Sequence, residues 1–237
     1  MDFIKPLGLK RNKLVIGTTG DYRPFSYLDP SINKLVGFDI ELITFLCENI
    51  ELSYSFINTT WSTFEDELDC GKFDIAVGGI SLTSSRRERF LISSPLLCDG
   101  KIPIVHVDNK NKFNDIKSID KPDVTVIVNS GGTNEKFAYQ HIKLAKIVVF
   151  DDNNLIFEQI ATKKADVMIT DGIEALYQQK INDYLYAVNP QNMLTNEKYG
   201  FLFAKNNYEL RDLINAQLDI IKKTDKYKAM HNHFFNK

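Results

Sequence analysis

The chain of 237 residues has little cysteine, no strong excess of either charge and no long apolar run. Its three cysteines, Cys47, Cys70 and Cys98, lie far apart and form no C-x-x-C pair, which argues against a disulfide scaffold and a cysteine zinc site. Lys and Arg number 29 against 31 Asp and Glu, so the chain lacks the basic surface of a nucleic-acid binder. No apolar run approaches the ~18 residues of a membrane helix, so membrane insertion is not expected.

Motifs for metals and cofactors are also missing. The four histidines show no H-E-x-x-H spacing, and the glycines form neither G-x-G-x-x-G nor G-x-x-x-x-G-K. We therefore expect no metal site and no nucleotide cofactor. The sparse cysteines are better explained as small apolar side chains, and we expect Cys47 and Cys70 to lie in the core.

Short apolar strands alternate with helices in two successive parts of the chain, a pattern that predicts a mostly parallel α/β sheet in each. In the first part, we expect strands at 13–18, 52–57 and 73–77 and helices at 37–49 and 61–70. In the second part, we expect strands at 124–128, 145–150 and 165–169 and helices at 134–142, 155–162 and 172–179.

Two extended apolar runs, 101–107 (KIPIVHV) and 199–203 (YGFLF), lie outside this alternation. In the simplest arrangement, each of the two parts forms one lobe. The first run then connects lobe 1 to lobe 2, and the second connects lobe 2 back to lobe 1. We therefore expect lobe 1 to span 1–104 together with 202–237, and lobe 2 to span 105–201. Two crossing strands would form a hinge, with a ligand cleft between the lobes at the carboxyl ends of the strands.

Two segments of lobe 1 carry candidate binding residues. The loop GTTGDYRPFSY at 17–27 follows a buried strand and presents Asp21 and Tyr22 to the cleft; the alternative is a turn with aromatic core anchors. The segment GGISLTSSR at 78–86 contains Gly79, which permits close approach of a ligand, and the hydroxyl of Ser81.

Arg86 lies at the end of the second segment, in the first turn of a helix that Thr83 is expected to cap. The helix dipole does not favour a cation there. A carboxylate ligand gripped through two hydrogen bonds would offset this cost. The alternative is an ordinary surface arginine.

Two segments of lobe 2 carry further candidates. In SGGTNEKF at 130–137, glycines precede Thr133 and Asn134 at a helix start, which is typical either of an N-cap or of an anion site. In TDGIE at 170–174, Asp171 and Glu174 share one face of a starting helix near the expected cleft. The alternative is a pair of acids favoured there by the helix dipole.

The loop GTTGDYRPFSY, the pattern S-x-T-x-x-R at 81–86 and the two crossings resemble type II periplasmic solute-binding proteins. The resemblance covers almost the whole chain. It implies that Arg86 grips a ligand carboxylate and that Asp171 accepts the ligand ammonium. It also implies that Tyr22 and Trp61 enclose the ligand between their rings.

Four blocks resemble the cyclohexadienyl dehydratases more narrowly: the 17–27 loop, DGKIPI at 99–104, GGTNEKFA at 131–138 and TDGIEA at 170–175. This family uses the binding-protein fold to convert prephenate to phenylpyruvate and arogenate to phenylalanine. The sequence departs from the family where Cys98 and Ile102 replace polar residues next to Lys101, and also at Ser130 and Arg23.

The resemblance implies a mechanism without cofactor or metal. Glu174 acts as general acid, with its pKa raised by burial and by substrate carboxylates, and Asn134 orients the leaving hydroxyl. Arg86 and Thr133 would hold the side-chain carboxylate, while Lys101 would meet the second negative charge. Trp61 and Tyr22 would pack on the ring. The rival hypothesis is a non-catalytic amino-acid or carboxylate receptor of an ABC transporter, with its permease as partner.

The compartment is the last expectation. The first residues, MDFIKPLGLKRNK, have no apolar core and no cleavage site of a signal peptide. Since relatives of this fold are mostly exported, we expect a periplasmic protein whose export signal has been removed. A cytoplasmic protein is the alternative.

Overall fold

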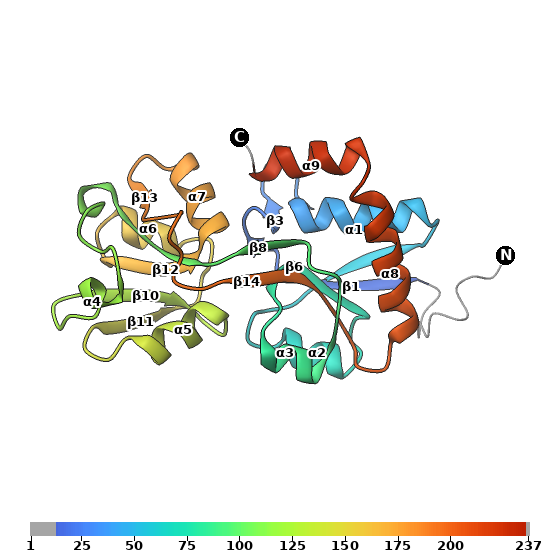
Figure 1. The fold of residues 1–237 in the computed structure, drawn as a ribbon, viewed down its shortest axis with the longest axis horizontal. Helices are drawn as coiled ribbons and strands as arrows, with labels where there is room; N and C mark the ends of the chain where they lie inside the picture. Colours follow the sequence, from blue (N-terminus) through green and yellow to red (C-terminus); the bar gives the residue numbers. More distant parts are fainter. Residues whose placement is uncertain (1–12, 236–237) are drawn as a thin grey trace. The chain divides into compact units, whose positions relative to one another are not determined.

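The structure is a computed structural model that describes residues 13–235 (Figure 1). The expectation about a signal peptide concerns residues that lie mostly outside this range. The described chain divides into two units: unit 1 runs up to Leu97 and resumes at Lys198, and unit 2 spans Cys98–Glu197. The expected boundaries lay later, at 104 and 201. The first boundary is earlier because strand β9 (Lys101–His106) pairs with β12 (Val167–Asp171) inside unit 2.

The sheet of unit 1 has three parallel strands and antiparallel additions. Its order is β5 (Tyr54–Asn58), β1 (Leu14–Thr18), β6 (Ile75–Ser81), β14 (Glu197–Phe203) and β7 (Leu91–Ile92), with β8 (Leu97–Asp99) pairing with β14. Strands β5, β1 and β6 are parallel, whereas β14 is antiparallel to β6. The predicted alternation of strands and helices in this part of the chain is therefore present.

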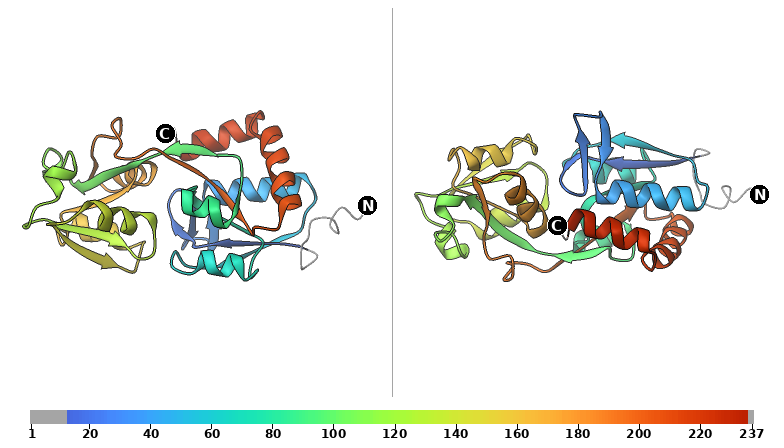
Figure 2. Two further views of the ribbon diagram at one scale, coloured as in Figure 1. Left: turned by 60° about the horizontal axis from the view of Figure 1, so that its bottom comes forward. Right: turned by 90° about the horizontal axis from the view of Figure 1, so that it is seen from above.

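Helices cover both faces of this sheet. They are α1 (Phe38–Asn49), α2 (Phe64–Asp69), α3 (Ser84–Arg89), α8 (Tyr208–Ile221) and α9 (Asp225–Phe235). Figure 1 shows α1 and α9 on one side of the sheet and α2 and α3 on the other. α9 packs along α1 (Figure 2), where the Phe38 ring lies 4.7 Å from that of Phe235.

Close packing explains a glycine in the central strand of unit 1. Every residue of β1 is buried, and Gly17 lies against the ring of Phe73. A Cβ atom at Gly17 would come within 2.6 Å of that ring, so no larger residue fits. The apolar run of β1 is continuous because helices cover the sheet on both faces.

A small three-stranded sheet was not expected from the sequence. It consists of β2 (Asp21–Tyr22), β3 (Ser26–Asp29) and β4 (Lys34–Val36), all antiparallel, and it begins within the segment 17–27 that was interpreted as a loop. Its strands are too short to show an alternation of apolar and polar residues, which is the signal that identifies strands in a sequence.

The sheet of unit 2 is also mixed. Its order is β11 (Lys146–Phe150), β10 (Thr125–Asn129), β12, β9 and β13 (Leu185–Ala187), with β9 and β13 antiparallel to their neighbours. The helices are α4 (Ile116–Ile119), α5 (Thr133–His141), α6 (Ile156–Ala161) and α7 (Gly172–Ile181), with a 3-10 turn at Val107–Asn109.

Alternate residues of the central strands enter different cores. Val126 and Val128 of β10 pack with Phe137 of α5, whereas Ile127 packs with Phe157 of α6. This follows from the two-residue repeat of a strand, which directs neighbouring side chains to opposite faces. Both faces are therefore apolar, and polar side chains gather where the strands end.

The cysteines are reduced and separate. Cys47 is buried on α1 as expected, but Cys70 is exposed, so the expectation of a buried Cys70 was wrong. Cys70 is the C-cap residue of α2. Cys98 is also exposed. None of the helices in residues 13–235 is long and apolar enough to span a membrane.

Candidate functional site

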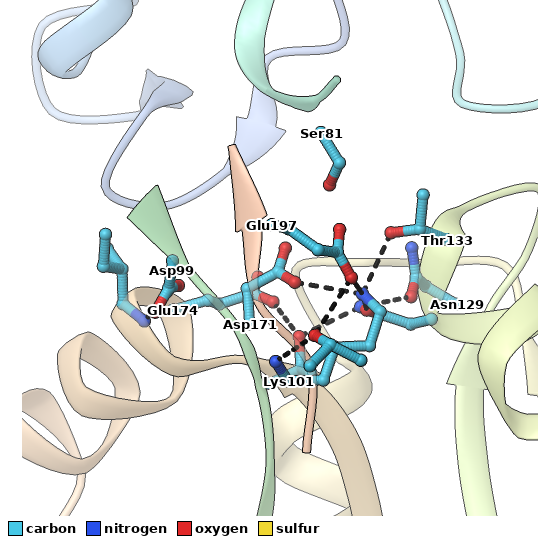
Figure 3. Close-up of polar contacts among 12 residues, drawn as sticks. Ser81, Asp99, Lys101, Asn129, Thr133, Asp171, Glu174 and Glu197 are labelled. Carbon is cyan, nitrogen blue, oxygen red and sulfur yellow. Dashed lines mark hydrogen bonds and ion pairs between the residues drawn. The ribbon is translucent and has the colours of Figure 1, made fainter. Parts of the chain in front are cut away.

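A cluster of polar side chains lies at one edge of the unit 2 sheet, built by three chain segments (Figure 3). Strand β12 ends at Asp171, which pairs in register with Lys101 at the start of β9. Helix α7 begins immediately after Asp171 and carries Glu174 in its first turn. Helix α5 begins at Thr133, shortly after β10 ends.

Lys101 is the centre of this cluster and is only 1% exposed. Its Nζ donates to Thr133 Oγ1 at 3.0 Å, to Asn134 Oδ1 at 2.6 Å and to Asp171 Oδ1 at 3.0 Å. An ammonium group has three N–H donors, so these contacts use all of them. The charge of the buried lysine is paired with that of Asp171 in an ion pair of 3.0 Å.

Lys101 fixes the orientation of the Asn134 amide, and Asn134 in turn fixes the hydrogen-bond direction at Thr170. Lysine can only donate, so the amide oxygen of Asn134 faces Lys101 and its NH2 group faces away. That NH2 group donates to Asn129 Oδ1 at 3.1 Å and to Thr170 Oγ1 at 3.0 Å. Because the Thr170 oxygen accepts there, its own hydrogen is directed to Glu174 Oε2, at 2.5 Å. A one-way chain of hydrogen bonds thus connects Lys101 to Glu174.

Glu174 is 1% exposed and is hydrogen-bonded to Thr170, the residue before Asp171. Thr170 and Asn129 were not identified as site residues from the sequence. Thr170 could have been considered, since it begins the block TDGIE. A single hydroxyl on a strand is, however, too common to predict a site residue.

Glu197 also belongs to the cluster and was missed. Its Oε1 accepts from the hydroxyl of Thr195 at 3.1 Å and lies 3.8 Å from Lys101 Nζ. Its Oε2 is buried and has no hydrogen-bond partner among residues 13–235. Glu197 lies far along the chain from the other members, in a segment without a motif, so nothing in the sequence pointed to it.

Asp99 holds the beginning of α7. Its Oδ2 accepts from the backbone N–H of Ile173 at 2.8 Å, and its Oδ1 would lie 2.8 Å from a Cβ atom at Gly172. Burial raises the pKa of Asp99 to about 6, against the opposing effect of the Ile173 hydrogen bond. Asp99 therefore anchors the turn that carries Glu174.

In unit 1, Arg86 is buried rather than on the surface, with 3% exposure. Its Nε donates to Glu65 Oε1 at 2.9 Å and its Nη1 to the carbonyl oxygen of Ser81, also at 2.9 Å. Thr83 caps α3 as expected by accepting from the Arg86 backbone N–H at 3.3 Å. Glu65, which the sequence did not indicate, supplies the negative charge that balances Arg86. Two of the five guanidinium donors are used in these contacts.

The aromatic candidates of unit 1 lie next to one another. Trp61 Nε1 donates to Asp21 Oδ1 at 3.1 Å, and the Trp61 and Tyr22 rings meet edge-on, with centroids 5.4 Å apart. Phe64 joins this group to the arginine, since its ring lies 5.8 Å from Trp61 and 5.0 Å below the Arg86 guanidinium.

Gly79 and its neighbour Gly78 are held by a buried carboxylate. Asp39 Oδ2 accepts from both backbone N–H groups, at 2.8 and 2.9 Å. Gly79 has φ of 71°, and a Cβ atom there would lie 2.5 Å from the Tyr22 ring. Burial raises the pKa of Asp39 to about 6, although both hydrogen bonds oppose the shift.

The residues predicted from the sequence thus form two groups. Unit 2 gathers five of them into one network, and these are Lys101, Thr133, Asn134, Asp171 and Glu174. Unit 1 contains the others, which are Asp21, Tyr22, Trp61, Gly79, Ser81 and Arg86. In residues 13–235, no group of three or more His, Cys, Asp or Glu side chains is arranged to hold a metal ion.

Comparison with known proteins defines the class of protein. Residues 14–237 match the model of the bacterial extracellular solute-binding proteins, family 3, and the chain belongs to this family. Its fold is the expected type II periplasmic binding fold. The ancestral amino acid-binding protein AncCDT-1, a precursor of cyclohexadienyl dehydratase, aligns with a TM-score of 0.88 at 33% identity, covering 95% of this chain and 96% of that one.

Individual relatives narrow this assignment. Cyclohexadienyl dehydratase of Pseudomonas aeruginosa is 42% identical over 183 residues, which are 77% of this chain and 68% of that protein. An ancestral cyclohexadienyl dehydratase, AncCDT-3, is 40% identical with a TM-score of 0.58, covering 96% of this chain and 94% of that one. The resemblance found in the sequence motifs is therefore confirmed. The L-cystine-binding protein TcyJ of Escherichia coli is 23% identical over 95% of this chain and 84% of its own length.

Proposed function

We propose that this protein is a cyclohexadienyl dehydratase, which converts prephenate to phenylpyruvate, arogenate to phenylalanine, or both. The single observation that carries the proposal is the hydrogen-bonded chain from Lys101 through Asn134 to Glu174. It holds a buried carboxyl group in one orientation. The 42% identity to the Pseudomonas aeruginosa dehydratase supports the same conclusion.

The reaction requires a proton donor and no oxidant or reductant. The carboxyl O–H of Glu174 donates its proton to the ring hydroxyl, whose C–O bond breaks to release water. The bond from the ring to its carboxylate breaks as well, and that electron pair enters the ring as carbon dioxide leaves. Prephenate dianion plus one proton thus yields phenylpyruvate anion, water and carbon dioxide. Glu174 is left ionised and regains a proton from solvent.

The network would also direct the proton. Thr170 donates to Glu174 Oε2, so that oxygen acts as an acceptor. We propose that the neutral acid passes its proton from the carboxyl group to the substrate hydroxyl. General acid catalysis near neutral pH requires this neutral form of Glu174, which is 1% exposed.

Other residues would bind the substrate. Arg86 and the Thr133 hydroxyl would hold the side-chain carboxylate, and the rings of Trp61 and Tyr22 would pack on the substrate ring. Lys101 contributes its charge and the orientation of Asn134, since all its donors are already used. We assign auxiliary binding contacts to the Asp21 carboxylate, the Gly79 backbone, the Ser81 hydroxyl and the Asp171 carboxylate.

The second candidate function is a transport receptor for an amino acid or carboxylate, working with an ABC transporter permease. It is favoured by relatives such as the L-cystine-binding protein TcyJ, which matches nearly the full chain. A receptor binds its ligand without turnover.

The test is turnover of prephenate and arogenate by purified protein, followed by the absorbance of the aromatic product. We expect activity without added metal or nucleotide. Glu174→Gln keeps the size of the side chain but cannot supply an acidic proton, so turnover should fall at least ~10²-fold. Glu158→Gln, at an exposed position of α6, is the matched control and should retain full activity. Saturable amino-acid binding without turnover between about pH 5 and 9 would instead support the receptor function. This interval spans the range over which a glutamate with a raised pKa titrates.

We also propose that the protein works in the periplasm, as membership of an extracellular solute-binding family supports. The proposed substrates are small molecules, and no nucleic acid is invoked. Fractionation of the native organism tests the compartment. Recovery of the protein in the cytosol would overturn the periplasmic assignment and would also remove the transporter alternative, because such a receptor meets its ligand outside the inner membrane.

A further inference from the structure

The unit 2 cluster contains more negative than positive charge. Lys101 carries one positive charge, and the carboxylates of Asp171 and Glu197 lie 3.0 and 3.8 Å from its Nζ. One ammonium group thus lies beside two carboxyl groups, and the formal charges of these three side chains sum to −1. All of them are buried or nearly so, with side-chain exposures of 2%, 5% and 18%. Solvent therefore screens this excess weakly.

One carboxylate oxygen of this cluster, Glu197 Oε2, receives no hydrogen bond from residues 13–235. Lys101 uses its three donors on Thr133, Asn134 and Asp171, so it has none left for Glu197. The Thr195 hydroxyl donates to Glu197 Oε1, while Oε2 is buried without a hydrogen-bond partner in the described part of the chain. A buried carboxylate oxygen without a donor costs free energy, which a ligand that brings a donor would recover.

We propose that Glu197 is a specificity-determining residue that accepts a hydrogen bond from the substrate ammonium, so that arogenate is preferred over prephenate. The inference rests on the proposed dehydratase function and adds to it the choice between the two substrates. The two molecules differ at one position, where arogenate carries an ammonium and prephenate a keto oxygen. An ammonium neutralises the surplus charge and donates to Oε2. A keto oxygen can only accept, and it would face a carboxylate.

The cluster is consistent with this assignment in its other contacts. Glu197 is not needed to hold Lys101 in place, since three shorter contacts already do so. Its own position is held by Thr195, whose oxygen accepts from the Lys101 backbone N–H at 2.9 Å. Thus Thr195, which is bound to the strand that carries the lysine, orients Glu197, and Glu197 Oε2 keeps no hydrogen bond within the described residues.

The experiment compares kcat/KM for arogenate and prephenate in the wild type and in Glu197→Gln. We expect the wild type to prefer arogenate. In the variant, kcat/KM for arogenate should fall roughly tenfold to a hundredfold, which is the effect of losing one charged hydrogen bond. That for prephenate should stay level or rise. Glu197→Asp, which keeps the charge, should retain part of the preference, and Glu158→Gln should change neither value.

A merely structural role for Glu197 predicts a different result, because both substrates would then lose the same factor. That outcome, or a wild-type preference for prephenate, overturns the inference while the dehydratase proposal stands. Far-ultraviolet circular dichroism checks that Glu197→Gln folds. If Glu197→Gln does not fold, Glu197→Asp is used instead. Its shorter side chain should lower kcat/KM for arogenate and leave that for prephenate unchanged.

Binding measurements, which need no turnover, test the role of Glu197 even if the protein is not a dehydratase. L-phenylalanine and phenylpyruvate differ by the same ammonium and keto groups, and calorimetry gives their affinities. The inference expects L-phenylalanine to bind more tightly, with the difference lost in Glu197→Gln. Equal affinities, tighter binding of phenylpyruvate or no binding of either compound would overturn it, whether or not the protein is catalytic.

Discussion

Replacing Asp39 by asparagine should remove a pH dependence from the stability of unit 1. Asp39 is 2% exposed, and its carboxylate receives the backbone N–H groups of Gly78 and Gly79. Despite these donors, burial raises its pKa from the ordinary value of 3.8 to about 6. The folded protein therefore binds a proton at Asp39 more tightly than the unfolded chain does.

The sign and size of the effect follow from this difference. Between about pH 4 and 6 the folded state binds more protons at this site, so stability falls as the pH rises. Below pH ~4 the carboxyl is protonated in both states, and above pH ~6–7 it is ionised in both, so the contribution is constant there. At about 1.4 kcal/mol per pKa unit, the ionised carboxylate costs about 3 kcal/mol at neutral pH.

Asparagine keeps an oxygen that can accept from Gly78 and Gly79 but does not titrate. Its amide also introduces a donor at a buried position, which shifts stability by a constant amount at every pH. The informative quantity is therefore the stability of the wild type minus that of Asp39→Asn. We expect it to decrease by about 3 kcal/mol between pH 4 and pH 7. Tyr227, whose pKa is raised by burial and by the Asp39 charge, titrates far above this range.

The assay is urea unfolding followed by tryptophan fluorescence at a series of pH values. Trp61 is the only tryptophan of the chain and lies in unit 1, so its emission reports unfolding of the unit that contains Asp39. Asp219→Asn, at an exposed position of α8, is the matched control and should leave the pH profile unchanged. A constant difference between wild type and Asp39→Asn across pH 4–7 (the range set by the two pKa values) would refute the reasoning, because it would mean that Asp39 titrates alike in both states.

Two further substitutions test the candidate site. Arg86→Lys keeps the charge but loses the planar donor fork, so KM should rise at least ~10-fold, and an unchanged KM and kcat would show that Arg86 only pairs with Glu65. Thr170→Val keeps the shape but removes the hydroxyl between Asn134 and Glu174, so kcat should fall roughly tenfold with little change in KM. Full activity of Thr170→Val in steady-state kinetics would show that this link does not orient the acid.

Local sequence patterns were sufficient for the elements and for part of the site. The apolar runs of β1, β10 and β12 identified central strands, since continuous burial on both faces leaves no polar position. Asn134 and Glu174 could be placed at helix starts after such strands, because a short loop after a strand keeps its residues at the strand's end. The family motifs added their chemical roles.

Other features depend on contacts between distant segments, which local patterns do not encode. Lys101 contacts Asp171 only because β9 pairs antiparallel with β12. The sequence of neither strand predicts the register of this pairing. Glu65 and Glu197 reach their partners, Arg86 and Lys101, from segments without a motif. A sequence reveals which residues can ionise or donate. Which of them are desolvated together, and so acquire a strong electrostatic effect, is decided by the tertiary structure, because burial and pairing arise only when the strands and helices pack.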